Sequence, residues 1–107
     1  MIVELDSLSF NEDQFNQALK GYRYSLVDFM APWCAPCKVL FKSLQELDPG
    51  INILKVNAEL AKILLTKYSV SKVPTLVIVR EDGSMVCKEV GVWPAPAIEK
   101  WFLEKTV

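Results

Sequence analysis

The pattern of apolar and polar positions divides the chain into alternating strands and helices. Short apolar runs bounded by turn residues are typical of strands, and apolar residues spaced three or four apart are typical of helices. The runs that predict strands are residues 2–5, 24–31, 51–56, 76–79 and 84–90. The segments that predict helices are residues 12–20, 37–47, 58–68 and 97–105. This alternation predicts an α/β fold in which helices cover both faces of a sheet.

Turn residues mark the boundaries between these elements. Asn11 is suited to the N-cap of the first helix, and Gly21 follows its end. The sequence Asp-Pro-Gly at residues 48–50 stops the second helix. Residues 81–84, with Gly83, predict a hairpin, so the last two strands pair antiparallel and the sheet is mixed. No repeat or linker interrupts the chain, and we expect one domain over residues 1–107.

Composition and charge exclude several classes of protein. The chain is 51% apolar and 23% charged, as in ordinary globular proteins, and its net charge of −1 comes from 12 basic and 13 acidic residues without a charged block. We therefore expect neither nucleic acid nor a membrane as a partner. The longest weakly charged stretch, residues 21–36, contains Arg23 and Asp28 and does not predict a membrane span. The N-terminus lacks the pattern of a signal peptide, so we expect a cytoplasmic protein.

The chain has no histidine and three cysteines. Without histidine, Ser-His and Cys-His catalysis and histidine-ligated metal sites are excluded. A zinc site needs four ligands, and only Cys87 accompanies Cys34 and Cys37, so we expect no metal within one chain. A cluster shared between two chains, or a pair of inert buried cysteines, are the alternatives that the pattern leaves open.

Cys34 and Cys37 lie where a strand gives way to a helix. A thiolate at a helix N-terminus is stabilised by free amide groups and the helix dipole, which lower its pKa. Pro36 fits the first helical turn and leaves the Cys37 amide to donate to the Cys34 sulfur. The spacing also permits a disulfide. We expect Cys34 to be exposed and to attack a substrate disulfide, and Cys37 to be more buried and to resolve the mixed disulfide.

Several spaced motifs resemble those of the thioredoxin family. Residues 28–38 (DFMAPWCAPCK) are similar to the family signature D-F-x-A-x-W-C-G-P-C-K. The motifs K-V-N, K-Y, V-P-T and V-G follow in the family's order, at residues 55–57, 67–68, 73–75 and 90–91. The resemblance covers nearly the whole chain. It implies a thioredoxin fold, with a five-stranded mixed sheet in the order 1-3-2-4-5 flanked by four helices.

The resemblance also implies a biochemical activity. Members of the family are protein dithiol/disulfide oxidoreductases that reduce protein disulfides by thiol–disulfide exchange. They act in electron transport and cell redox homeostasis and take electrons from a thioredoxin reductase. We accordingly expect protein disulfides as substrates, thioredoxin reductase as electron donor, no bound cofactor and a monomeric chain.

Specific residues acquire expected roles from the resemblance. Asp28 matches a buried aspartate that exchanges a proton with the resolving cysteine through water, and Lys55 matches a lysine beside it. An aspartate at a strand end facing solvent and an ordinary exposed lysine are the alternatives. Pro74 matches a cis-proline that faces the cysteines. The residues expected to bind substrate are Trp33, Ala35, Pro36, Val73, Pro74, Gly91 and Val92.

Aromatic residues near this surface have a second interpretation. Trp33 is expected at the substrate surface, although an aromatic residue packed on the start of the helix is the alternative. Trp93 lies either beside that surface or under the last helix. Cys87 is expected to be a small buried packing residue.

The chain departs from the family pattern at a few positions. Ala35 replaces a glycine, Met30 a common tryptophan and Lys42 a proline that kinks the helix, and residues 93–96 bring two prolines to the start of the last helix. These departures leave open whether the chain is a general thioredoxin or a specialised relative. Two further alternatives are a thiol oxidase or isomerase in an oxidising compartment and a non-enzymatic binding module.

Overall fold

The computed structural model describes residues 2–5 and 11–107. Its elements follow the order that the sequence predicts. Along the chain they are β1 (Ile2–Leu5), α1 (Glu12–Leu19), β2 (Tyr24–Met30), α2 (Ala35–Gln45), β3 (Asn52–Asn57), α3 (Lys62–Lys67), β4 (Thr75–Arg80), β5 (Met85–Val90) and α4 (Ala95–Lys105).

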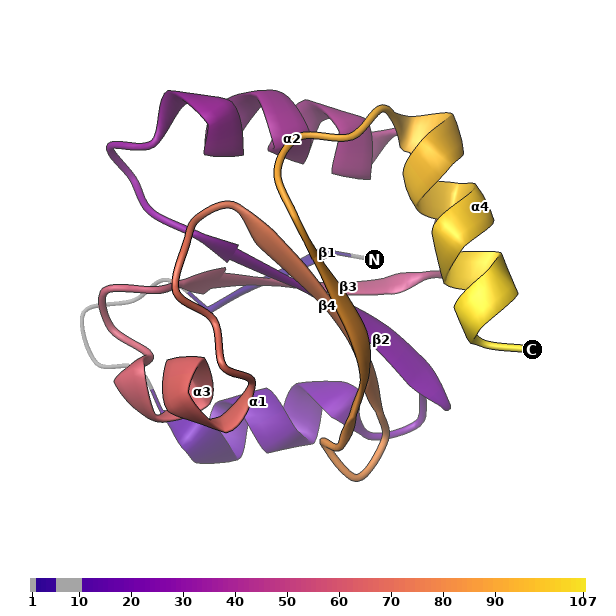
Figure 1. The fold of residues 1–107 in the computed structure, drawn as a ribbon. Coiled ribbons are helices and arrows are strands. Elements are labelled where there is room, and N and C mark those ends of the chain that lie inside the picture. The colour runs from indigo at the N-terminus through magenta and orange to yellow at the C-terminus, as the bar shows by residue number, and fades with distance from the viewer. Residues whose placement is uncertain (1, 6–10) are drawn as a thin grey trace.

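The strands form one mixed sheet in the order β1-β3-β2-β4-β5, as expected. β3 pairs parallel with both β1 and β2, whereas β4 pairs antiparallel with β2 and β5. Figure 1 shows α2 and α4 on one face of the sheet and α1 and α3 on the other. The central strand β2 is therefore covered on both sides.

Two groups of buried side chains fill the space between the sheet and its helices. Phe15, Leu64 and Tyr68 pack on the α1/α3 side, and Leu40, Leu44 and Ile98 pack on the α2/α4 side. Alternate residues of β2 join the two groups because successive strand side chains point to opposite faces. Val27 contributes to the first and Leu26 to the second. This double burial explains why β2 is a nearly continuous apolar run.

The helix expected over residues 58–68 is shorter in the structure, where α3 covers only Lys62–Lys67. Asn57 accounts for the difference. Its side-chain oxygen accepts a hydrogen bond from the Glu59 amide at 2.9 Å, and its carbonyl accepts one from the Leu60 amide at 3.1 Å. These bonds close a turn in place of the first helical turn.

The last helix begins two residues earlier than expected. Pro94 is its N-cap and Pro96 lies in its first turn. Both prolines are tolerated there because the amides of a helix's first turn have no partner within the helix. α2 likewise begins at Ala35, directly after Cys34.

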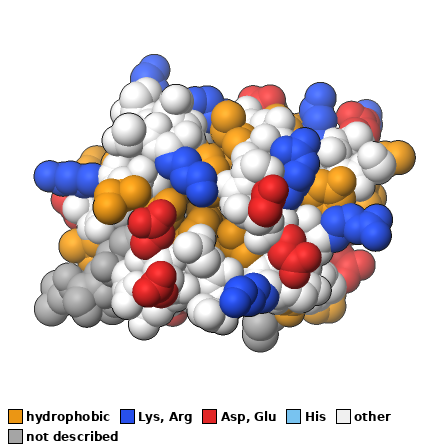
Figure 2. All heavy atoms as spheres, turned by 90° about the horizontal axis from the view of Figure 1, so that it is seen from below, with side chains coloured by type: hydrophobic (Ala, Val, Ile, Leu, Met, Phe, Trp, Pro, Cys, Tyr) orange, Lys and Arg blue, Asp and Glu red, His pale blue; other side chains and the backbone are white. Residues whose placement is uncertain are grey.

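Charged side chains of both signs are interspersed over the face that carries α1 and α3, with apolar side chains between them (Figure 2). This distribution agrees with the net charge of −1. Within residues 2–5 and 11–107, every helix is too short or too polar to cross a membrane.

Candidate active site

Cys34 and Cys37 lie at the N-terminus of α2, just beyond the end of β2. Cys34 is the N-cap, and Pro36 stands in the first turn. The Cys37 amide donates a hydrogen bond to Cys34 Sγ at 3.2 Å, as the sequence predicts. The two cysteines form a disulfide with a Cα–Cα distance of 5.3 Å. The pair therefore has the geometry for exchange between dithiol and disulfide.

The two cysteines are both buried, with exposed fractions of 4% for Cys34 and 2% for Cys37. The expectation that Cys34 is exposed is wrong for this disulfide form. Met30, Ala31 and the two cysteines form a small apolar cluster, and Val73 packs against it. In contrast, Ala35 and Pro36 are exposed in the first turn of α2.

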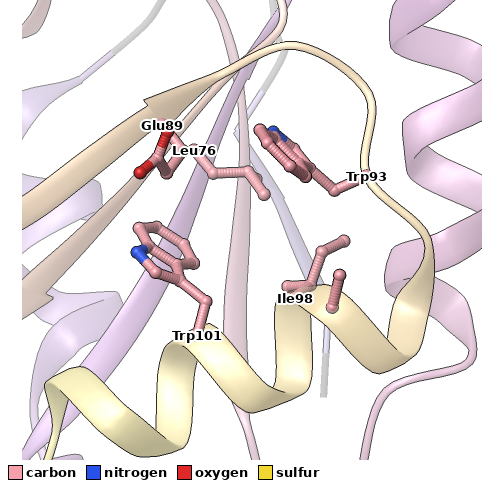
Figure 3. Close-up of a pocket in the computed structure, with 6 residues that line it drawn as sticks. Leu76, Glu89, Trp93, Ile98 and Trp101 are labelled. Atoms are coloured by element: carbon pink, nitrogen blue, oxygen red, sulfur yellow. The ribbon is translucent and has the colours of Figure 1, made fainter.

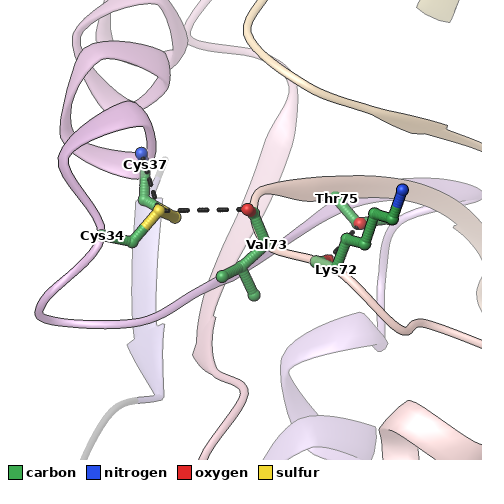
Figure 4. Close-up of a disulfide and its surroundings, with 5 residues drawn as sticks. All are labelled: Cys34, Cys37, Lys72, Val73 and Thr75. Carbon is green, nitrogen blue, oxygen red and sulfur yellow. Dashed lines mark hydrogen bonds between the residues drawn. A yellow bond between two sulfur atoms is a disulfide. The ribbon is translucent and has the colours of Figure 1, made fainter.

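The segment before β4 faces the disulfide. The Val73–Pro74 peptide bond is cis, as expected from the resemblance. The Val73 carbonyl oxygen lies 4.0 Å from Cys34 Sγ, the contact drawn in Figure 4. Thr75 Oγ1 donates to the Lys72 carbonyl at 2.6 Å and holds the segment together from both sides of Pro74.

Four of the expected substrate-binding residues lie together as two pairs in the structure. Trp33, which is 70% exposed, and Val73 line the same hollow of about 460 Å³. The Gly91 amide donates to the Pro74 carbonyl at 3.0 Å and joins the end of β5 to the cis-proline segment. Val92 is exposed next to Gly91. The exposure of Trp33 rules out the alternative of an aromatic side chain buried against the helix.

Asp28 lies inside the molecule, in the middle of β2. Its exposed fraction is 0%, and neither carboxyl oxygen has a hydrogen-bond partner among the described residues. Burial raises the pKa of Asp28 to about 7, and the positive charge of Lys55 opposes this increase. The alternative of a solvent-facing aspartate is therefore wrong. A carboxyl group with this pKa can exchange protons near neutral pH.

Lys55 stands opposite Asp28 in the parallel pairing of β2 and β3. Its ammonium group lies 3.3 Å from Glu4 Oε1 and 4.4 Å from the centroid of the Phe41 ring. The Lys55 side chain is only 18% exposed, so it is not an ordinary solvated lysine. Sequence reasoning missed the contacts with Glu4 and Phe41. The signal that identifies Glu4 is its pairing with Lys55 between β1 and β3, which the residue pattern alone does not give.

A cavity of about 380 Å³ opens beside Cys37. Its walls include Met30, Cys37, Phe41 and Lys55. Asp28 and Met30 are two residues apart on β2, so their side chains project from the same face of the sheet. The structure thus places Cys37, the Asp28 carboxyl group with its raised pKa, and Lys55 on the α2 side of β2.

Two further residues with an expected place are Cys87, within β5, and Trp93, between β5 and α4. Trp93 is 41% exposed, and its indole nitrogen donates to the Val90 carbonyl at 3.3 Å. Cys87 packs against the α2/α4 side of the core as expected, but it is half-buried where a buried residue was expected. Its partial burial raises the pKa of the thiol. β5, which carries Cys87, is the edge strand of the sheet among the described residues, so its outer side is not covered by another of the described strands.

The sequence model of the thioredoxin family matches residues 6–104. The chain belongs to the thioredoxin family. It is 37% identical to the thioredoxin of Bacillus subtilis over 79 residues, which cover 70% of this chain and 75% of that protein. It is also 34% identical over 109 residues to the protein disulfide-isomerase of Zea mays, a match that covers 94% of this chain but 21% of that longer protein.

A solved structure gives the same result for the fold. The oxidised form of mitochondrial thioredoxin 3 from Saccharomyces cerevisiae superimposes with a TM-score of 0.78 at 26% identity, covering 96% of this chain and 94% of that one. Together with the Cys34–Cys37 pair at disulfide distance, these similarities make the chain a thioredoxin-type thiol–disulfide oxidoreductase.

Proposed function

We propose that this member of the thioredoxin family reduces disulfide bonds of other proteins, with Cys34 as nucleophile and Cys37 as resolving thiol. The observation that carries the proposal is the Cys37 amide 3.2 Å from Cys34 Sγ at the N-terminus of α2. In the reduced protein, this donor and the helix dipole stabilise a Cys34 thiolate and lower its pKa. The thiolate is the attacking form of the thiol.

The reaction transfers two electrons from the cysteine pair to the substrate. The Cys34 thiolate attacks one sulfur of the substrate disulfide, and the other sulfur leaves as a thiolate that takes up a proton. Cys37, once deprotonated, attacks Cys34 Sγ and displaces the second substrate sulfur. The products are the Cys34–Cys37 disulfide and a substrate dithiol. A thioredoxin reductase returns the pair to the dithiol form by supplying two electrons.

Asp28 and Lys55 are proposed to serve the second step. The Asp28 carboxylate accepts the proton of Cys37 through a water molecule, because its pKa of about 7 suits transfer near neutral pH. Lys55 stabilises the carboxylate, since its positive charge lowers the pKa of Asp28. The pair thus controls when Cys37 becomes a nucleophile.

The surface around the disulfide is proposed to hold an extended segment of the substrate protein. The backbone of Val73 pairs with that segment as an added strand does. The exposed Trp33 supplies apolar contact area beside it. The full set of proposed substrate-binding residues is Trp33, Ala35, Pro36, Val73, Pro74, Gly91 and Val92.

The cellular setting is proposed from the same resemblance. We expect residues 1–107 to act as one monomeric domain in the cytoplasm, in electron transport and cell redox homeostasis. The similarity to the Bacillus subtilis thioredoxin supports this setting.

The redox potential of the Cys34–Cys37 pair is the measurement that tests the direction of the reaction. A reductase is expected near the value for thioredoxin, about −270 mV. A value above about −200 mV contradicts the proposal and favours an oxidase or isomerase, an alternative that the similarity to protein disulfide-isomerase supports.

Reduction of insulin disulfides with a chemical reductant is a second test. Cys34→Ser and Cys37→Ser should each abolish turnover, while Cys87→Ser should retain it because Cys87 lies outside the pair. Equal activity of all three variants contradicts the proposal.

A further inference from the structure

A small apolar pocket lies between β5 and α4. Its volume is about 120 Å³, which is room for one side chain. Figure 3 shows two indole rings bordering it from different segments, Trp93 before α4 and Trp101 within α4. Leu76 of β4 and Ile98 of α4, both fully buried, form its floor. The pocket is therefore built mainly on β4, β5 and α4, and Trp93 comes from the segment between β5 and α4.

Glu89 provides the single acidic group of this pocket. It is exposed on β5, and Figure 3 shows its carboxyl group beside the ring of Trp101. Within the described part of the chain, Glu89 forms no ion pair, whereas Glu4 pairs with Lys55. An unpaired carboxylate next to indole faces fits a cation carried on an apolar stem, because the cation is attracted both to the ring faces and to the carboxylate.

The pocket lies close to the surface proposed to bind substrate. Leu76 pairs with Glu89 one position beyond the pairing of Thr75 with Val90. Leu76 is two residues from Pro74, which corresponds to about 7 Å along a strand. Trp93 follows Gly91 and Val92 directly. A protein whose disulfide sits over Cys34 therefore brings residues near that disulfide within reach of the pocket.

We propose that this pocket binds an arginine side chain of the substrate protein, a few residues from the disulfide that is reduced. The inference rests on the proposed function, since it names the class of substrate. Arginine fits better than lysine because a planar guanidinium stacks on an indole ring and pairs with a carboxylate through two hydrogen bonds. The Trp93 ring is already held by its bond to the Val90 carbonyl, so little ordering is needed when the side chain enters.

Pairs of short peptides with an internal disulfide test the proposal. The two members of a pair differ only in carrying arginine or citrulline, which has the same shape without the charge, at one position within four residues of a cysteine. At the position from which the side chain reaches the pocket, the arginine peptide is expected to have a kcat/KM about five- to tenfold higher than the citrulline peptide. Glu89→Gln should remove this preference, and Trp93→Leu should reduce it.

A matched variant separates the pocket from general attraction between charges. Glu46→Gln removes one negative charge from an exposed residue at the end of α2 and should keep the preference for arginine. Equal kcat/KM for both members at every position overturns the inference. An equal loss of preference in the Glu46→Gln and Glu89→Gln proteins also overturns it, because the effect then comes from the overall charge.

If no peptide is reduced at all, the proposed function fails, and the pocket is judged by binding alone. Calorimetry with the same peptides, their cysteines replaced by serine, then decides the inference. Tighter binding of the arginine peptide that is lost in Glu89→Gln supports it, and equal binding of the two peptides overturns it.

Discussion

At the scale of single residues, the site depends on how Asp28 is buried. A carboxyl group without a hydrogen-bond partner in an apolar interior prefers its neutral form. The pKa of about 7 means that the group holds a proton at mildly acidic pH and releases it above neutrality. The proposed proton transfer to and from Cys37 follows from this property.

Asp28→Asn is expected to slow the release of substrate from the mixed disulfide by about 10²-fold at neutral pH, because Cys37 loses its proton acceptor. In the unchanged protein, the rate of this step should rise through pH 7 as the Asp28 carboxylate forms. Rapid-mixing kinetics across pH 5–9 measure it.

Asp13→Asn is the matched control, since Asp13 is exposed on α1, on the opposite face of the sheet from α2. It should leave the rate and its pH dependence unchanged. A rise through pH 7 that survives in Asp28→Asn speaks against the assigned role.

Glu4 and Lys55 are expected to shift the pKa of Asp28 in opposite directions. Glu4→Gln removes a negative charge and frees the Lys55 ammonium from its ion pair, so the pKa of Asp28 should fall. Lys55→Met removes the positive charge that favours the carboxylate, so the pKa should rise. NMR titration of the Asp28 carboxyl carbon measures both changes. Shifts of the same sign in the two variants refute this explanation.

At the scale of elements, α3 is attached to the β4–β5 hairpin through polar contacts. The buried Tyr68 hydroxyl donates to the Gly83 carbonyl at 2.6 Å. Lys88 Nζ donates to the Tyr68 carbonyl at 3.1 Å and to the Ser69 carbonyl at 2.5 Å, at the C-terminus of α3. A helix of only six residues depends on such contacts because it is too short to be stable alone.

Tyr68→Phe should lower the free energy of unfolding by about 1–2 kcal/mol, because the Gly83 carbonyl keeps its burial and loses its donor. Urea denaturation measures the change. Insulin reduction per folded molecule should stay constant, since the contact lies away from the disulfide. An unaltered unfolding midpoint shows that the bond contributes nothing.

The elements illustrate what the sequence predicts and where it fails. The apolar run of β2, the proline in the first turn of α2 and the glycine of the hairpin specify their structures locally, and each prediction was confirmed. α3 was predicted too long because Asn57 competes with the helix through its own side chain, an effect that residue periodicity does not register.

The site shows the same division between local and non-local information. The amide of Cys37 next to the Cys34 sulfur follows from a three-residue spacing. The contacts of Lys55 with Glu4 and Phe41 join residues far apart in sequence, and the pocket between Trp93 and Trp101 depends on how α4 packs against β5. Val73, 39 residues away in sequence, likewise contributes to the burial of Cys34.

At the scale of the whole molecule, Asp28 makes stability depend on pH. The folded protein holds the Asp28 proton up to a pKa of about 7, whereas the reference value for aspartate is 3.8. At a pH between these two values, the Asp28 carboxyl group is ionised in the unfolded chain but still protonated in the folded protein. The contribution of Asp28 to folding is therefore most favourable below the reference value, declines as pH rises to about 7, and is constant above that.

The advantage in stability of Asp28→Asn over the unchanged protein should accordingly grow by roughly 4 kcal/mol between pH 4 and pH 8, because a pKa difference of about three units is integrated over that interval. Denaturant unfolding of both oxidised proteins at several pH values measures it. A difference that stays constant with pH contradicts the assigned pKa.

The hydrogen bond from the Gly91 amide to the Pro74 carbonyl couples the end of β5 to the cis-proline segment, which faces the disulfide. Neither stretch can swing outward without breaking it. The rate of deuterium exchange at the Gly91 amide consequently reports how often this hydrogen bond opens. A decrease in that rate when a partner protein is bound would show that the partner stabilises the closed arrangement.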